Sequence, residues 1–147
     1  MPIRPATPAD VDEIGALIRE LAAYEQLEHE VRFTRDELAA HLFGPTPSAR
    51  VTMAVDDDGA VVGFALWFVT YSTFLGRSGI WLEDLFVRPE HRGRGFGVAL
   101  LRDLRERTDG RVEWMVLDWN TPSIEFYDRL GARPVTGWTT YRWSPEA

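Results

Sequence analysis

The feature that most constrains this chain is a glycine-rich turn between an apolar segment and an amphipathic helix. Residues 90–104 read EHRGRGFGVALLRDL, with glycine at positions 93, 95 and 97. Glycine adopts positive φ without penalty and lets a ligand approach the backbone closely. Successive N–H groups can then point into one concavity, and the start of the helix adds partial positive charge. A strand followed by such a turn and a helix is typical of a phosphate or pyrophosphate site.

Two common phosphate-binding motifs do not match this turn. It is not a Walker A loop, because no Gly-Lys-Ser/Thr sequence follows the glycines. It also differs from the dinucleotide-binding fingerprint, because the third glycine comes one residue early and the unit lies in mid-chain. The alternative is a purely structural turn, which the glycines alone do not exclude.

Bulk properties narrow the classes of protein. The 147 residues suit a single domain over 1–147, and the absence of cysteine excludes disulfides and cysteine nucleophiles and fits a cytoplasmic protein. The chain has no apolar run of ~20 residues, and we expect no membrane span. His29, His41 and His91 lack metal-ligand spacing, so no metal is expected. The net charge of −7 argues against nucleic acid and acidic membranes as partners and favours a cationic small molecule.

The hydrophobic pattern predicts an α/β fold. A short strand at Ile3 precedes a helix that begins after Thr7, with Pro8 and Asp10 completing a capping pattern. Thr34 is expected to cap a second, short helix. The order β-α-α-β-β-β-α-β-α-β indicates a mixed sheet with helices on its faces. Further strands are expected at residues 51–55, 61–69, 80–87, 111–119 and 139–144, and further helices from the glycine-rich turn to about residue 107 and at 120–131.

The glycine-rich turn carries a family resemblance. Arg92, Gly95 and Gly97 match the Arg/Gln-x-x-Gly-x-Gly/Ala motif, so the chain resembles the GCN5-related N-acetyltransferase (GNAT) superfamily. The likeness spans nearly the whole chain and is most specific to the diamine (spermidine/spermine, thialysine) acetyltransferase subfamily, through segments such as LEDLFVRPEHRGRGFG and VLDWNTPSIEFYDRLGA. It implies a GNAT-like mixed, mostly antiparallel sheet flanked by helices, acetyl-CoA as co-substrate, and a homodimer.

The resemblance also implies a cofactor site. In the family the turn holds the pyrophosphate of acetyl-CoA, and a bulge in the preceding strand, expected here near residues 85–87, frees backbone groups for the pantetheine arm and the thioester. Asn120 suits a cofactor contact and a plain helix cap equally well. The expected cofactor contacts are Leu85, Phe86, Val87, Arg92, Gly93, Arg94, Gly95, Phe96, Gly97, Val98, Asn120, Ser123 and Tyr127.

Two residues are expected to be catalytic. Attack of an amine on a thioester needs a base and an acid, because a primary amine has a pKa near ~10.4. The family's tyrosine at the position of Tyr127 points at the coenzyme A sulfur as general acid; the alternative is a core tyrosine. The resemblance implies that Glu83 is a base acting through water or a counter-charge; the alternative is an ion pair with an arginine. Asp84, on the opposite face of a regular strand, is expected to be structural.

The amine-binding residues are also implied by the resemblance. Tyr24 and Glu25 end the first helix, where the family's Tyr-Glu pair touches the amine, although glutamates at helix ends are usually just solvated. Polyamine-specific members carry an acidic residue and a tryptophan where this chain has Ser72 and Phe74, which favours shorter amines. The expected substrate contacts are Tyr24, Glu25, Glu83, Glu113, Trp114 and Met115.

The sequence thus predicts an acetyl-CoA-dependent N-acetyltransferase that acts on the primary amine of a small cationic substrate, by direct attack and without an acyl-enzyme. The substrate would be a short diamine, a thialysine-like amino acid or a polyamine. One alternative is a GNAT enzyme for a protein N-terminus or an antibiotic amine. Another is a non-catalytic sensor of acetyl-CoA, against which the presence of both Tyr127 and Glu83 argues.

Overall fold

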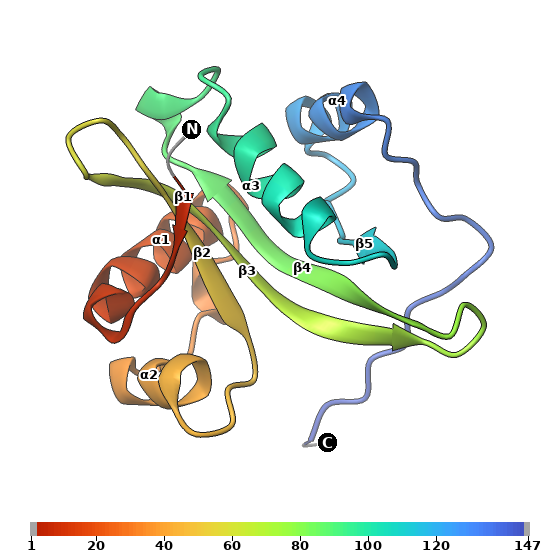
Figure 1. The fold of residues 1–147 in the computed structure, drawn as a ribbon, viewed down its shortest axis with the longest axis horizontal. Coiled ribbons are helices and arrows are strands. Elements are labelled where there is room, and N and C mark those ends of the chain that lie inside the picture. Colours follow the sequence, from red (N-terminus) through yellow and green to blue (C-terminus); the bar gives the residue numbers. More distant parts are fainter. Residues whose placement is uncertain (1–2, 146–147) are drawn as a thin grey trace. The chain divides into compact units, whose positions relative to one another are not determined.

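The computed structural model describes residues 3–145, which form two compact units, residues 3–115 and 116–145. No helix within the described residues is long and apolar enough to cross a membrane. The first unit holds the sheet and three α-helices (Figure 1). In chain order its elements are β1 (Ile3–Pro5), α1 (Val11–Tyr24), α2 (Arg35–Phe43), β2 (Arg50–Val55), β3 (Val61–Ser72), β4 (Arg77–Val87), α3 (Phe96–Glu106) and β5 (Val112–Glu113).

The sheet follows the chain order β1-β2-β3-β4-β5. Its strands pair antiparallel except for β4 and β5, which are parallel. The longest ladder joins β3 and β4, from Gly63 opposite Val87 to Ser72 opposite Arg77. The expected mixed, mostly antiparallel sheet flanked by helices is therefore confirmed.

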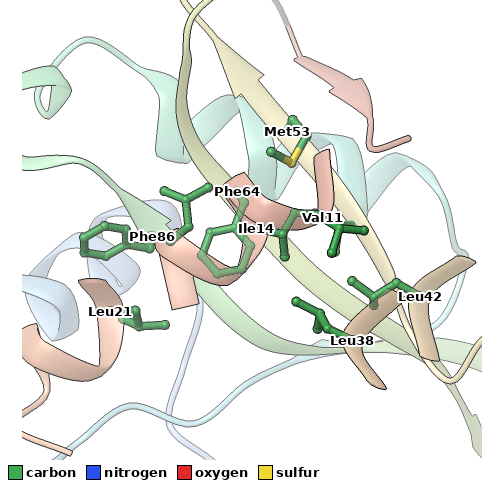
Figure 2. Close-up of a cluster of buried hydrophobic side chains, with 10 residues drawn as sticks. Val11, Ile14, Leu21, Leu38, Leu42, Met53, Phe64 and Phe86 are labelled. Carbon is green, nitrogen blue, oxygen red and sulfur yellow. The ribbon is translucent and has the colours of Figure 1, made fainter. Parts of the chain in front are cut away.

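Helices cover both faces of this sheet. On one face, α1 and α2 pack on the strands and enclose the main core (Figure 2). On the other face, α3 contacts β2, β3 and β4 (Figure 1). The core cluster comprises Val11, Ile14, Leu17, Leu21, Leu38, Leu42, Val51, Met53, Phe64 and Phe86.

Both N-terminal helices begin where their capping residues predict. Thr7 precedes a 3-10 turn, Pro8–Asp10, that leads directly into α1, and its backbone N–H donates to the Asp10 carboxylate at 2.7 Å. Thr34 caps α2 and forms the reciprocal capping box with Glu37. Each capping box satisfies backbone N–H groups that the first helical turn leaves without an acceptor.

A β-bulge interrupts β4 at Glu83. Leu66 lies opposite Asp84 and Trp67 lies opposite Leu82, so Glu83 is the extra residue in the ladder. The expected position near residues 85–87 was thus two residues too late. A regular strand would send one of two successive carboxyl groups under α3, where burying a charge is costly. The bulge lies at the position where a regular β4 would place a carboxyl group under α3.

The second unit contains one helix, α4 (Thr121–Leu130), which confirms the helix expected over 120–131. Two expected strands are corrected. The strand predicted over 111–119 is limited to β5, and residues 139–144 form no strand. Alternating apolar and polar residues make a strand only when a neighbour supplies hydrogen bonds. Residues 139–144 are instead exposed, including the side chains of Tyr141 and Trp143.

Candidate active site

The glycine-rich turn forms a cradle of unpaired backbone donors in the first unit. Gly93 has φ 77° and Gly95, which caps α3, has φ 90°. Within residues 3–145, no hydrogen-bond acceptor is found for the backbone N–H groups of residues 93–98, and the next N–H group, that of Ala99, donates to the Gly95 carbonyl at 3.0 Å. These donors lie at the positive end of α3.

The cradle fits the pyrophosphate that the resemblance implies. A Cβ added at Gly93 would meet no atom within 4 Å, so the space beside this backbone is open. Arg94 is exposed in the same turn and adds positive charge. Gly97 lies inside the first turn of α3, where its missing side chain leaves the backbone accessible. The local geometry is that of an anion-binding nest joined to a helix start.

Arg92 makes contacts different from those expected of a phosphate ligand. Its Nε donates to the carbonyl of Val87, the last residue of β4, at 2.7 Å. Its guanidinium carbon lies 5.1 Å from the ring centroid of Tyr24 and 5.3 Å from that of Phe86. Arg92 therefore links the turn to the end of α1 across the end of β4.

The last part of β4 has an open side. The pairing with β5 is confined to Ile80 and Trp81. The backbone N–H of Arg88 donates to Val62 in β3, and backbone groups alternate along a strand, so those of Leu85 and Val87 point away from β3. Within the sheet as described, Leu85 and Val87 have no partner strand on that side. The N–H and carbonyl groups of Leu85 and the N–H group of Val87 are available for a ligand that lies alongside β4, whereas the Val87 carbonyl already accepts from Arg92.

The bulge puts two consecutive carboxyl groups on the α1 face of the sheet. Asp84 lies opposite Leu66, which packs against the α1 core. Glu83 accepts a hydrogen bond from the indole N–H of Trp81 at 3.0 Å, two residues back along the same face. The expectation that Asp84 lies on the opposite face from Glu83 is wrong, because it assumed a regular strand.

These carboxyl groups share their surroundings with Glu25 at the end of α1. Burial and, to a smaller extent, the charges of Glu83 and Glu25 together raise the pKa of Asp84 to about 7. Burial, followed by the charge of Glu83, also raises the pKa of Glu25 above its ordinary value. Carboxylates that are partly buried together and lack a cation hold protons more tightly. The cluster is thus an electrostatic site for a positive charge.

The C-terminal end of α1, which carries Tyr24 and Glu25, is held in a strained conformation. Gln26 has φ 62°, the left-handed region that a side chain disfavours. The N–H of Leu27 donates to the Ala22 carbonyl at 2.8 Å and closes the helix end. Such backbone strain persists only where the surrounding structure maintains it.

The other expected substrate contacts lie along and just after β5. Glu113 pairs with Trp81 in the sheet, next to the bulge. Trp114 is half-buried, whereas the Met115 side chain is 64% exposed. Among the described residues, no group of three or more His, Asp or Glu side chains could hold a metal ion.

The remaining expected site residues belong to the second unit. Asn120 is buried and its side-chain oxygen accepts from the backbone N–H of Ser123 at 3.4 Å, so the cap that the sequence allowed is present. Tyr127 is half-buried, with its ring centroid 5.5 Å from that of Phe126. Asn120, Ser123 and Tyr127 share one side of the start of α4, because residues three and four apart are neighbours on a helix.

Comparison with known proteins identifies the family. Residues 16–132 match the acetyltransferase (GNAT) family. The chain belongs to this family. It is similar to thialysine N-epsilon-acetyltransferase of Bos taurus, with 37% identity over 159 residues that cover 99% of this chain and 93% of the relative. It is also similar to L-ornithine N5-acetyltransferase of Arabidopsis thaliana, with 31% identity over 193 residues that cover 99% of this chain and 85% of the relative.

A solved structure supports the same fold assignment. An integron cassette protein from the mobile metagenome of V. cholerae superimposes with a TM-score of 0.78 at 25% identity, covering 97% of this chain and 91% of the other. The chain is therefore a GNAT N-acetyltransferase, as the glycine-rich turn predicted. The residue that sequence reasoning did not place in the acidic cluster is Asp84. The sequence signal that could have indicated this is the pair of adjacent acids, Glu83 and Asp84, in an otherwise apolar strand. A regular strand would have to bury one of them on each face, which a bulge avoids.

Proposed function

We propose that this N-acetyltransferase transfers acetyl from acetyl-CoA to a primary amine of a small cationic substrate. The observation that carries the proposal is the cluster of Glu25, Glu83 and Asp84, which gathers negative charge on one face of the sheet. An ammonium group is the natural partner of such a cluster. The unpaired amides of residues 93–98 support a pyrophosphate at the end of the same strand.

The cofactor would be held by backbone groups of the first unit. The N–H groups of residues 93–98 would bind the pyrophosphate, and Arg94 would add charge. The open side of β4 at Leu85 and Val87 would bind the pantetheine arm as an added strand does. Phe96, Gly97 and Val98 would act through their backbone, since Phe96 itself is buried.

The acidic cluster would prepare the amine for attack. Glu83 would hold the ammonium as counter-charge, and Asp84 would accept its proton directly or through water. A carboxylate with a pKa of about 7 is largely ionised at slightly alkaline pH yet far more basic than an ordinary carboxylate. The neutral amine nitrogen would then attack the thioester carbon, and the carbon–sulfur bond would break without an acyl-enzyme.

The second unit would supply the proton for the leaving group. Tyr127 would donate its phenolic proton to the departing thiolate. It would then take up the proton that the attacking nitrogen releases as the amide forms. A phenol remains protonated at neutral pH, which this role requires. Asn120 and Ser123 would contact the cofactor from the start of α4. In this proposal both units form one N-acetyltransferase domain.

A short amine fits the acidic cluster better than a long polyamine. The charges of Glu83 and Glu25 raise the pKa of Asp84, and the charge of Glu83 raises that of Glu25, so the three carboxyl groups lie close together and match one cationic pole. A long polyamine needs acids spaced along its length. Ser72 ends β3, and Phe74 is 93% exposed in the turn that follows, so neither offers a second acid. The relatives named for thialysine and ornithine support an amino acid with a side-chain amine.

Tyr24, Glu113, Trp114 and Met115 would complete the amine site around the acids. We further propose that the enzyme works in the cytoplasm as a homodimer, as the family resemblance implies. Analytical ultracentrifugation of the purified protein tests the dimer, and a single monomeric species would contradict it.

The decisive experiment is the release of free coenzyme A thiol from acetyl-CoA in the presence of different amines. We expect release with thialysine, ornithine or a short diamine, weaker release with spermidine and spermine, and none without amine. A preference for spermine would overturn the short-amine proposal. Release only with a peptide or an aminoglycoside would move the enzyme to the alternative substrate class. Cofactor binding without release would favour the sensor.

A further inference from the structure

We infer that Arg92 is a positioning residue that couples occupancy of the glycine-rich turn to the amine site at the end of α1. The inference rests on the proposed function, because it assigns the turn to the cofactor and Tyr24 and Glu25 to the amine. It differs from the expected role of Arg92, which was to add charge at the pyrophosphate.

The contacts of Arg92 point away from a phosphate role. Its guanidinium carbon lies over the rings of Tyr24 and Phe86, at 5.1 and 5.3 Å from their centroids. Its Nε–H is directed to the carbonyl of Val87 at 2.7 Å. A guanidinium group is suited to this double role, because it is planar, stacks on aromatic rings and donates in its own plane.

This arrangement joins the two halves of the site through one side chain. Arg92 immediately precedes Gly93, the first residue of the cradle of unpaired amides. Tyr24 immediately precedes Glu25, a member of the acidic cluster. A ligand that fixes the backbone of the turn therefore restrains Arg92, and Arg92 restrains Tyr24 and its neighbour.

The end of α1 has a reason to need such restraint. Gln26 takes the left-handed conformation that ends α1, with φ 62°, where glycine is the preferred residue, so this helix end is closed less firmly than glycine would close it. Burial and the charge of Glu83 also disfavour the ionised form of Glu25 at this position. The contact of the Arg92 guanidinium group with the Tyr24 ring holds the residue next to Glu25 against local opening. When the cofactor has already ordered the turn, a second ligand at Glu25 loses less conformational entropy on binding.

Hydrogen exchange measured by mass spectrometry tests this coupling without requiring turnover. In the unliganded protein, R92Q should speed amide exchange over residues 22–27 by about two- to five-fold, the factor that corresponds to an exposed cation–π contact. R94Q is the matched control: it removes an exposed arginine from the same turn and should leave residues 22–27 unchanged. Unchanged exchange in R92Q would overturn the inference.

Coenzyme A is the probe for the liganded state. In the wild-type protein, saturating coenzyme A should protect residues 93–98 and also residues 22–27. In R92Q it should still protect residues 93–98 but no longer residues 22–27. Loss of coenzyme A binding in R92Q would make Arg92 a phosphate ligand and overturn the inference, while a wild-type protein that does not bind coenzyme A would overturn the proposed function itself.

A pair of Tyr24 variants checks the ring contact. Y24F keeps the aromatic ring and should keep the coenzyme A-dependent protection of residues 22–27. Y24L removes the ring and should lose this protection while coenzyme A affinity stays within about two-fold. In steady-state assays with thialysine, R92Q should raise KM for the amine more than it lowers kcat. Loss of the protection in Y24F would show that the hydroxyl group, not the ring, carries the link.

Discussion

Two aspartates of the first unit have opposite electrostatic surroundings. Asp10, at the start of α1, accepts hydrogen bonds from Arg4 at 2.8 and 3.0 Å and from the Thr7 backbone at 2.7 Å. The hydrogen bonds from Arg4 lower its pKa to about 2, against the opposing effect of burial. Asp84, at the bulge of β4, has Glu83 and Glu25 as neighbours, and its pKa is raised to about 7.

The difference separates a carboxylate that stabilises the fold from one that is prepared for chemistry. Donors around Asp10 favour its ionised form in the folded state, so its charge contributes to stability at neutral pH. The surroundings of Asp84 disfavour its charge, so the fold is less stable whenever Asp84 is ionised. A ligand cation would remove that penalty, which is typical of a binding or catalytic group.

The largest expected effect is on the reaction itself. Asp84→Asn keeps the size of the side chain but cannot accept the proton, and kcat/KM with thialysine should fall about 100-fold or more. The wild-type rate should rise with pH through about pH 7, where Asp84 loses its proton. Asp103→Asn on α3, whose carboxylate pairs with Arg107, is the control and should retain the wild-type rate and profile. A full rate in the Asp84 variant would assign the proton acceptor to another group.

The next effect concerns the stability that Asp10 provides. Asp10→Asn should lower the free energy of unfolding at pH 7 by about 2 kcal/mol, the value expected for a pKa lowered by nearly two units. Because the folded-state pKa is lowered, this stability is present above about pH 4 and lost as the pH falls toward 2. Urea unfolding at pH 7 and pH 3 measures both values. Asp12→Asn, which removes an exposed partner of Arg35, should change stability little.

An effect of opposite sign is expected at the bulge. Asp84→Asn should raise the free energy of unfolding at pH 8, by at most about 4 kcal/mol for a pKa raised by about three units, and leave it nearly unchanged at pH 4. The folded-state pKa of Asp84 is raised, so its neutral form supports the fold at low pH and this support is lost as the pH rises toward about 7. Urea unfolding of variant and wild type at the two pH values checks the sign. If Asp84→Asn instead destabilises the protein equally at pH 4 and pH 8, the Asp84 carboxyl group accepts hydrogen bonds that stabilise the fold, as that of Asp10 does.

The smallest expected effect sharpens the electrostatic comparison. Glu25→Gln removes one of the two charges that raise the pKa of Asp84, so the midpoint of the pH–rate profile should move to lower pH by a few tenths of a unit. Glu28→Gln, three residues further along the chain and exposed, should leave the midpoint in place. If neither substitution changes the midpoint of the pH–rate profile, the titrating group lies outside the acidic cluster.

Sequence reasoning predicted well those features that short segments determine. Thr7 and Thr34 mark helix starts because their side chains and backbones bond within a few residues. Gly93 and Gly95 adopt positive φ, as a turn before a helix requires. The family motif lies in this same local segment.

Features that depend on strand partners were harder to predict. The position of the bulge follows from the register between β3 and β4, which links residues far apart in sequence. The position of Asp84 beside Glu83 could not be predicted, because a regular strand assigns the two residues to opposite faces. The strand expected over 139–144 failed for a related reason, since its alternation says nothing about which strand would pair with it. Tyr127 keeps its proposed role on the family resemblance alone.

Glu83 is a residue that the β-ladder does not need. Deleting it would bring Leu82 and Asp84 together as neighbours opposite Trp67 and Leu66, which are already consecutive in β3. The side chains before and after the gap would keep their present faces, because the bulge occupies one position without changing the alternation around it. Seen as an insertion, Glu83 adds a carboxyl group to the sheet without shifting the pairing of β3 with β4 on either side of it.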